Sequence, residues 1–295
     1  MQQFLEAQQY HIDKWLANPQ IYLLVAALLL ASRWLPADPD DRRPGASIAI
    51  DYLYGVVYTL LLFPFFVVFF AWVEGALNTW APWLNLGLAE SLPAWVQILL
   101  AIFVNDFLAY VSHYCRHRFR FLWYFHSLHH SQEHMNPLTT KRTHPVERIF
   151  SRLCIFWLPL AIIGSPPQLW AIYILVDAIW DYFIHSNLRV NLGPLGRVLV
   201  SPQYHRIHHS RLPEHADKNF SDRFVIWDLL FGTAYLRQGE YPPVGLAGGD
   251  TFPSERSLQP WNLFRTYLAQ MWYPFRMIHS DMRQRRAIDG METRD

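Results

Sequence analysis

The uncharged run YLYGVVYTLLLFPFFVVFFAWV is the feature that most limits what this chain can fold into. It covers residues 52–73, a total of 22, and a helix needs roughly 20 apolar residues to cross a bilayer. Hydrophobic residues make up 52% of the chain and charged residues only 17%, whereas soluble domains carry about 25% charge. The run therefore predicts a membrane protein rather than a soluble domain with a very apolar core.

Three further apolar stretches predict additional membrane segments, at residues 21–35, 92–105 and 153–176. The last is interrupted by SPP at 165–167. Since irregular backbone at membrane depth persists only where protein or water satisfies it, we favour a hairpin that turns within the membrane over one broken crossing. The expected fold is all-α: an integral membrane helical bundle of about four membrane segments, with a helical cap that carries the histidines.

Basic residues indicate how the chain is oriented in the membrane. Residues 116–152 contain seven Lys and Arg and residues 33–43 contain three, whereas residues 74–90 contain none. By the positive-inside bias, the histidine-rich segment and the C-terminal region face the cytoplasm. The formal net charge of +1 shows no concentrated basic excess, so a nucleic-acid partner is not expected.

Histidines are concentrated in the middle of the chain: 11 of the 14 lie between His113 and His209. His113 and His117 share one helix face, and FHSLHHS and YHRIHHS repeat the spacing H-x-x-H-H. Neutral imidazole is the commonest metal ligand among side chains. The candidate ligands are His113, His117, His126, His129, His130, His185, His205, His208 and His209. Because a tetrahedral ion needs about four ligands, nine histidines favour two ions.

The stretch FHSLHHSQEH also contains H-x-x-E-H at 130–134, the motif of an inverted zinc peptidase. In a membrane zinc hydrolase Glu133 would be the general base, and His130 and His134 would bind the zinc. The second copy of the repeat does not preserve this half, because SRLPEH follows His209. A further alternative is a non-catalytic metal-binding membrane protein, which would spread its ligands across the bilayer, whereas every cluster falls on the inferred cytoplasmic side.

The order H-x-x-x-H, H-x-x-H-H, H-x-x-H-H between membrane segments resembles the fatty acid hydroxylase and sterol desaturase superfamily of integral-membrane di-iron oxygenases. MNPLTTKRTHPVE (135–147), FIHSN (183–187) and NFSDRFVIWDLLFGT (219–233) are also similar to motifs of that family. The resemblance covers about residues 50–235. It implies three parts: residues 1–45 with a first membrane helix, a histidine-box hydroxylase or desaturase domain at 46–240, and a partly helical, membrane-peripheral tail at 241–295.

The resemblance implies that the nine histidines hold two iron ions, with zinc as an alternative in a purified sample. O₂ would be the co-substrate for hydroxylation, which we prefer, or desaturation of a C–H bond of a lipid. Some members carry a second histidine four residues before His185, where this chain has Asp181. Asp181 is a candidate metal ligand or a carboxylate that orients His185. His134, His144 and Asn187 are candidates for similar supporting roles.

The source of electrons is expected to lie outside the chain. The sequence contains neither an H-P-G-G haem motif nor a G-x-G-x-x-G dinucleotide motif. We therefore expect a separate electron-donor protein that meets the basic cytoplasmic face.

Overall fold

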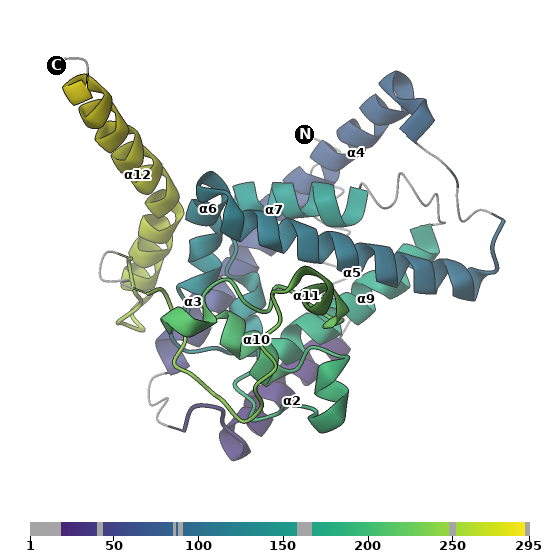
Figure 1. The fold of residues 1–295 in the computed structure, drawn as a ribbon, viewed down its shortest axis with the longest axis horizontal. Coiled ribbons are helices and arrows are strands. Elements are labelled where there is room, and N and C mark those ends of the chain that lie inside the picture. The colour runs from purple at the N-terminus through teal and green to yellow at the C-terminus, as the bar shows by residue number, and fades with distance from the viewer. Residues whose placement is uncertain are drawn as a thin grey trace.

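The computed structural model describes residues 19–39, 44–84, 87, 91–157, 167–247 and 252–292. Within these ranges there is no β-strand, only three isolated bridges, which confirms the expected all-α fold. The α-helices are α2 (Pro19–Trp34), α3 (Pro44–Val57), α4 (Phe63–Trp80), α5 (Ala94–Arg118), α6 (Arg120–His130), α7 (Pro145–Arg152), α9 (Pro167–Ile184), α10 (Pro202–His208), α11 (Ile226–Phe231) and α12 (Pro260–Glu292) (Figure 1). π-helical stretches cover Tyr58–Leu62 and Leu153–Trp157, and 3₁₀ turns cover Pro82–Leu84, Pro137–Lys141, Gly193–Arg197 and Pro213–His215.

Pro64 shapes the longest apolar helix. Proline lacks a backbone N–H, and its ring clashes with the carbonyl four residues earlier. The helix widens into the π-helical stretch Tyr58–Leu62 just before this proline, between α3 and α4. Such widened turns are rare and often lie at functional sites. The three segments form one helical path through residues 45–80.

Among the described residues, two helices are long and apolar enough to cross a membrane, Gly45–Trp80 and Ala94–Arg118. The helix Gln20–Trp34 is apolar but shorter. The turn of the expected hairpin, at residues 158–166, lies outside the described residues. The expectation of about four membrane segments, with the histidines on the cytoplasmic side, therefore stays a prediction.

Helices α5 and α6 meet at Phe119, whose extended backbone (φ −97°, ψ 111°) ends the first helix and begins the second. The two helices pack against each other, so the last turns of α5 lie beside α6. This contact brings the H-x-x-x-H motif of α5 to the H-x-x-H-H motif of α6. The sharp turn is thus the local reason why the motifs of two successive helices share one site.

The third histidine motif lies on the short helix α10, which begins with a clear capping signal. Ser201 precedes Pro202, and the Ser201 hydroxyl accepts a hydrogen bond from the Tyr204 N–H at 3.1 Å. Serine at the cap and proline at the first helical position are both favoured at helix starts. The cap holds the motif helical as far as His208, with His209 at the C-terminal cap.

A largely buried charged network ties the segment after the second motif to two other parts of the chain. The Arg142 guanidinium donates to Asp51 of α3 at 2.7 Å and to Glu255 at 2.6 Å. Asp51 also accepts hydrogen bonds from Gln132 and Asn136. We call Asp51, Arg142 and Glu255 the Arg142 network. It connects α3, the segment 131–142 and the stretch before α12.

Helix α12 extends away from the other helices toward the C-terminus (Figure 1). It is anchored by Tyr267 and Tyr273, which share a core cluster with residues of α3 and α6, among them Tyr54 and Leu128. The C-terminal region therefore contributes to the same core as the histidine-bearing helices. Its expected position at the membrane periphery stays a prediction.

Candidate metal centre

The structure brings all nine predicted ligand histidines together in two groups. A five-histidine group contains His113, His117, His126, His130 and His208, and a four-histidine group contains His129, His185, His205 and His209. Within each group the ligand nitrogens lie within 4.8 Å of one another, and only His117 is not fully buried. The groups are adjacent, because the His130 and His209 rings stack with centroids 4.5 Å apart.

The two groups do not correspond to the sequence motifs. In FHSLHHS, the first and last histidines join the five-histidine group and His129 joins the other. In YHRIHHS, His205 and His209 join the four-histidine group and His208 crosses to the other. The middle histidine of each H-x-x-H-H motif is therefore exchanged between the groups. Both motifs are needed to build either site.

The distances between the histidine nitrogens fit a metal ion. In the five-histidine group, His130 Nε2 lies 3.1 Å from the Nε2 atoms of His117, His126 and His208. In the four-histidine group the corresponding contacts are 3.0–3.2 Å. Two ligands about 2.1 Å from one ion and at right angles lie about 3.0 Å apart. The Nε2 atoms thus occupy the spacing of neighbouring coordination positions.

Hydrogen bonds on the opposite ring nitrogen fix which nitrogen faces the centre. The Nδ1–H of His113 donates to the Phe220 carbonyl and that of His208 to the Lys218 carbonyl, both at 2.8 Å. His185 Nδ1 lies 2.8 Å from the Asp181 carbonyl. A proton on Nδ1 leaves the Nε2 lone pair free for a metal, the usual arrangement around ligating histidines.

Burial keeps these rings in the state that a metal requires. Burial lowers the pKa well below the ordinary value of 6.5 for His126, His129, His130, His205, His208 and His209. Neighbouring histidines lower the pKa of these rings further, and Arg116 adds to the effect on His126 and His129. They are therefore neutral at physiological pH, as coordination demands. Nearby, burial raises the pKa of Asp222 to about 7.

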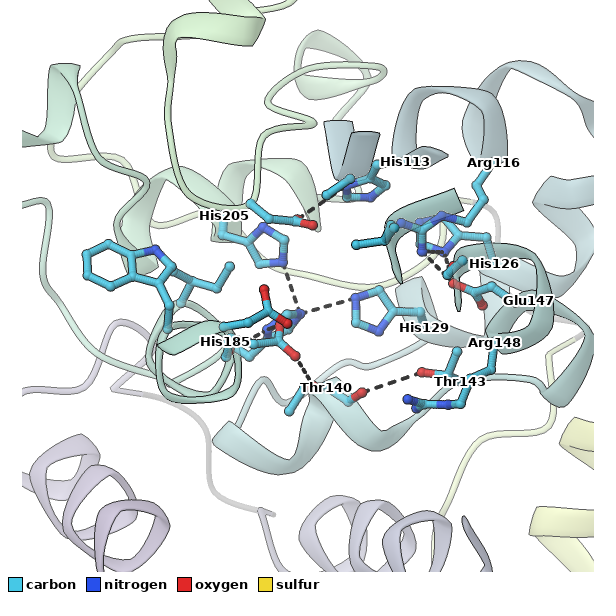
Figure 2. Close-up of a pocket in the computed structure, with 18 of the residues that line it drawn as sticks. His113, Arg116, His126, His129, Thr140, Thr143, Glu147, Arg148, His185 and His205 are labelled. Carbon is cyan, nitrogen blue, oxygen red and sulfur yellow. Dashed lines mark hydrogen bonds and ion pairs between the residues drawn. The ribbon is translucent and has the colours of Figure 1, made fainter. Parts of the chain in front are cut away.

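Asp181 lies beside the four-histidine group but is not one of its members. One carboxylate oxygen is 3.1 Å from His185 Nδ1, and the other accepts a hydrogen bond from Thr140. Figure 2 places Thr140 next to His185 on the wall of the cavity. Of the two roles considered for Asp181, this geometry favours orienting His185.

Residues 130–134 do not form the helix that the H-x-x-E-H motif of a zinc peptidase requires. Helix α6 ends at His130, and Glu133 is exposed. His130, Glu133 and His134 therefore do not share one helix face, which the zinc-hydrolase alternative requires. His134 belongs to neither histidine group.

Two further candidates have contacts elsewhere. Asn187 accepts hydrogen bonds from Arg206 and from the backbone N–H of Asp38. His144 caps α7: its Nδ1 accepts from the Val146 N–H at 3.2 Å, and its Nε2 donates to the Met271 carbonyl at 3.3 Å. Neither residue belongs to a histidine group, and their contacts are those of structural links.

His144 gives a prediction for the pH dependence of stability. Burial lowers its pKa to about 4, while the unfolded chain has a pKa near 6.5. Between these values the unfolded state binds the extra proton, so stability falls as pH drops from about 6.5 to 4, by about 3 kcal/mol. His144→Asn keeps a capping side chain and should remove this slope. Thermal unfolding of the metal-loaded protein from pH 7 to pH 4.5 tests it; parallel curves for both proteins contradict it.

Glu147 is a site residue that motif spacing alone does not reveal. Its carboxylate lies 2.7 Å from His126 Nδ1 and accepts from Arg116 at 2.6 Å. Its burial is nearly complete, and burial raises its pKa while Arg116 opposes that rise. The signal available in the sequence was its place at the end of THPVE, one turn into a helix that starts at a proline.

We expect Glu147→Gln to weaken metal binding selectively in the five-histidine group. Loss of a carboxylate behind a ligating histidine typically costs about 10–100-fold in metal affinity. Competition with a metal chelator should show this loss for one ion per chain and little change for the other. The exposed Glu133→Gln is the matched control. Equal weakening of both ions contradicts the assignment.

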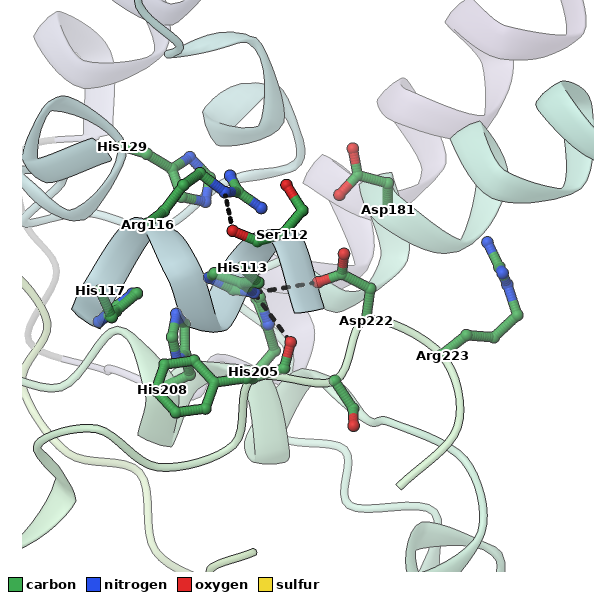
Figure 3. A network of polar contacts seen from close by, with 12 residues as sticks. Ser112, His113, Arg116, His117, His129, Asp181, His205, His208, Asp222 and Arg223 are labelled. Carbon is green, nitrogen blue, oxygen red and sulfur yellow. Dashed lines mark hydrogen bonds and ion pairs between the residues drawn. The ribbon is translucent and has the colours of Figure 1, made fainter. Parts of the chain in front are cut away.

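The loop that follows the third motif orients His113 and His208 through its backbone carbonyls. Asp228 accepts hydrogen bonds from the backbone N–H groups of Phe220 and Ser221, and from Tyr204. These hydrogen bonds fix the position of the Phe220 carbonyl, which accepts a hydrogen bond from His113. Figure 3 shows His113 facing Asp222 of the same loop, at 3.6 Å.

Comparisons with known proteins agree with this site. The family profile described as fatty acid hydroxylase matches residues 98–233, a range that contains all nine histidines. The chain is 39% identical over 176 residues to alkylglycerol monooxygenase of Danio rerio, covering 60% of this chain and 37% of the relative. It is 31% identical over 169 residues to the Caenorhabditis elegans protein of the same name, covering 56% and 32%.

A bacterial relative is also similar. Ornithine lipid hydroxylase of Rhizobium tropici is 31% identical over 144 residues, covering 49% of this chain and 43% of that protein. The chain thus aligns with less than half the length of each of these relatives. No solved structure matches the chain significantly.

Proposed function

The chain belongs to the fatty acid hydroxylase superfamily, and from this premise we propose that it is an O₂-dependent, di-iron membrane hydroxylase of a lipid. The observation that carries the proposal is the pair of adjacent histidine groups. Imidazole ligands suit iron, and zinc in a sample that lacks iron. Two such ions, when bound, supply O₂ activation for attack on an unactivated C–H bond.

The chain's own residues would orient the ligands and exclude water. Glu147 and the Phe220 carbonyl fix the rings of His126 and His113. Trp123 and Phe220 lie on His117, with ring centroids 4.9 and 5.0 Å away. Aromatic cover of this kind keeps solvent from the reacting atoms. Hydroxylation is preferred over desaturation, for which the same metal site would serve.

The surroundings of the reaction are part of the proposal. We infer a membrane-embedded chain whose active site faces the cytoplasm, with the lipid drawn from the bilayer and electrons from a separate protein. The basic residues of segment 116–152 favour an acidic donor. Turnover with such a donor should fall as ionic strength rises, and a rate that is constant with salt contradicts this part.

The test is oxygen incorporation by the purified protein. The protein is loaded with iron, analysed for about two ions per chain, and incubated with a membrane lipid extract, a chemical reductant and isotopically labelled oxygen. Mass spectrometry should find a lipid that gained one labelled oxygen atom. A lipid that only lost two hydrogens makes the protein a desaturase, and one zinc with no oxidised lipid overturns the proposal.

A further inference from the structure

A cavity of about 180 Å³ opens onto the candidate metal centre. His113, His126 and His129 line one part of it, and residues of α7 and α9 line another. Pockets for whole small molecules usually measure about 300–1,000 Å³. The cavity therefore has room for a headgroup and a few adjacent atoms, but not for a whole lipid.

The walls of this cavity combine apolar surface with many charged side chains. Four arginines (Arg116, Arg148, Arg152 and Arg223) and four carboxylates (Glu147, Asp177, Asp181 and Asp222) line it. An all-hydrocarbon substrate such as a plain alkyl chain would leave these groups buried against an apolar surface, which is costly. The lining indicates that a polar part of the substrate enters the cavity.

Each of the four carboxylates already has a partner. Arg116 and His126 bind Glu147, and Arg223 binds Asp177. The other two lie against histidines: Asp181 is 3.1 Å from His185, and Asp222 is 3.6 Å from His113.

Arg148 and Arg152 differ, because neither forms an ion pair with a carboxylate in the part of the chain that the structure describes. They stand four residues apart at the end of α7, on one helix face. Arg148 lies over the Tyr58 ring at 4.3 Å, a contact that positions its guanidinium without neutralising it. Figure 2 shows Arg148 beside Thr143 on the cavity wall.

A third donor lies in the wall of the same cavity. Trp180 lines it from α9, and its indole N–H is buried without a hydrogen-bond partner among the described residues. A buried donor left unpaired costs about 1–3 kcal/mol, so a ligand acceptor at this point is favoured. Tryptophan can only donate, so the missing partner must carry acceptor atoms.

We propose that Arg148, Arg152 and Trp180 form a binding site for the anionic headgroup of the lipid, a phosphate or a carboxylate. Both anions offer several acceptor oxygens and match the planar fork of arginine. This inference rests on the proposed function and names its substrate class. Because one cavity contains both the arginines and the metal-facing histidines, the oxidised carbon lies close to the headgroup.

The site is tested by binding rather than turnover. Three probes share a dodecyl tail and differ in the head: dodecyl phosphate, N-dodecanoylglycine and the uncharged 1-O-dodecylglycerol. Each is titrated into metal-loaded protein in phosphatidylcholine nanodiscs without oxygen. At least one anionic probe should bind about tenfold or more tighter than the uncharged probe. Preference for one of the two anions identifies the source of the charge.

Substitutions of the two arginines test whether they cause the preference for an anionic probe. Arg148→Gln and Arg152→Gln should each reduce affinity for the preferred anion by about tenfold, with metal content and binding of the uncharged probe unchanged. Arg197→Gln, an exposed basic residue outside the cavity, should change nothing.

Equal affinity of the wild-type protein for all three probes overturns the site, even if a variant fails to fold. So does an equal loss in Arg197→Gln. Absence of oxygen incorporation with intact anion binding would instead reject the proposed function and leave this site standing.

Discussion

We expect His126→Ala to remove one metal ion per chain and leave the other, and His129→Ala to remove the opposite ion, although the two residues lie three positions apart in one motif. The reason is that His126 belongs to the five-histidine group and His129 to the four-histidine group. His129→Ala should weaken its ion more, because it leaves three ligands instead of four. Activity should fall by more than about 100-fold in both variants, since even partners behind the ligands are worth about 10–100-fold.

Double variants make this partition sharper. The double variant His126→Ala/His208→Ala removes two ligands from the five-histidine group only, so about one ion per chain should remain. The double variant His126→Ala/His205→Ala removes one ligand from each group, and both ions should be lost. Metal analysis after gel filtration measures the outcome, with the exposed His279→Ala as the control that retains two ions. If metal loss follows the sequence motifs instead of the groups, the partition is wrong.

Arg142→Met should lower the free energy of unfolding by about 3–5 kcal/mol, because it leaves the buried Asp51 and Glu255 carboxylates without their cation. For a chain of this size that corresponds to roughly 10 °C in the thermal midpoint. Arg142→Lys should recover only part of the loss, since lysine cannot bridge two carboxylates with a planar fork. Thermal unfolding of the metal-loaded protein in detergent measures the change.

A surface pair provides the comparison for this prediction. Arg120 binds Asp281 at 2.8 Å, but the Arg120 side chain is 60% exposed. Exposed ion pairs contribute about 0–1 kcal/mol, so Arg120→Met should shift the midpoint little. Combining Arg142→Met with Asp51→Asn and Glu255→Gln should restore much of the stability, because no buried charge is then left unpaired. Equal effects of Arg142→Met and Arg120→Met contradict the importance of the network.

Spacing in the sequence predicted the nine candidate ligands but not their distribution between the two groups. A spacing of four residues places His126 and His130 on one helix face, and the structure keeps that pair together. Whether His129 faces the same ion depends on how α6 packs beside α10, which local spacing does not encode. The all-α fold followed from apolar periodicity and length, and the structure confirms it.

Supporting residues were harder to predict for a related reason. His144 has the residue type of a ligand but lies at a helix start, where its ring caps the backbone. Glu147 and Arg142 are ordinary charged residues in the sequence, and their importance comes from complete burial and from partners as far away as Asp51 and Glu255. Burial of a charge is decided by tertiary packing, so it is difficult to predict from a single sequence.

The exchange of the middle histidines has a consequence for how the protein acquires its metals. An ion in either group holds histidines from both α6 and α10, so it also restricts the motion of the neighbouring ligands that form the other group. The second ion therefore meets ligands whose ordering cost is already reduced. Loading should therefore be weakly cooperative: the second ion should bind more tightly than the first, while either group can still hold its ion alone.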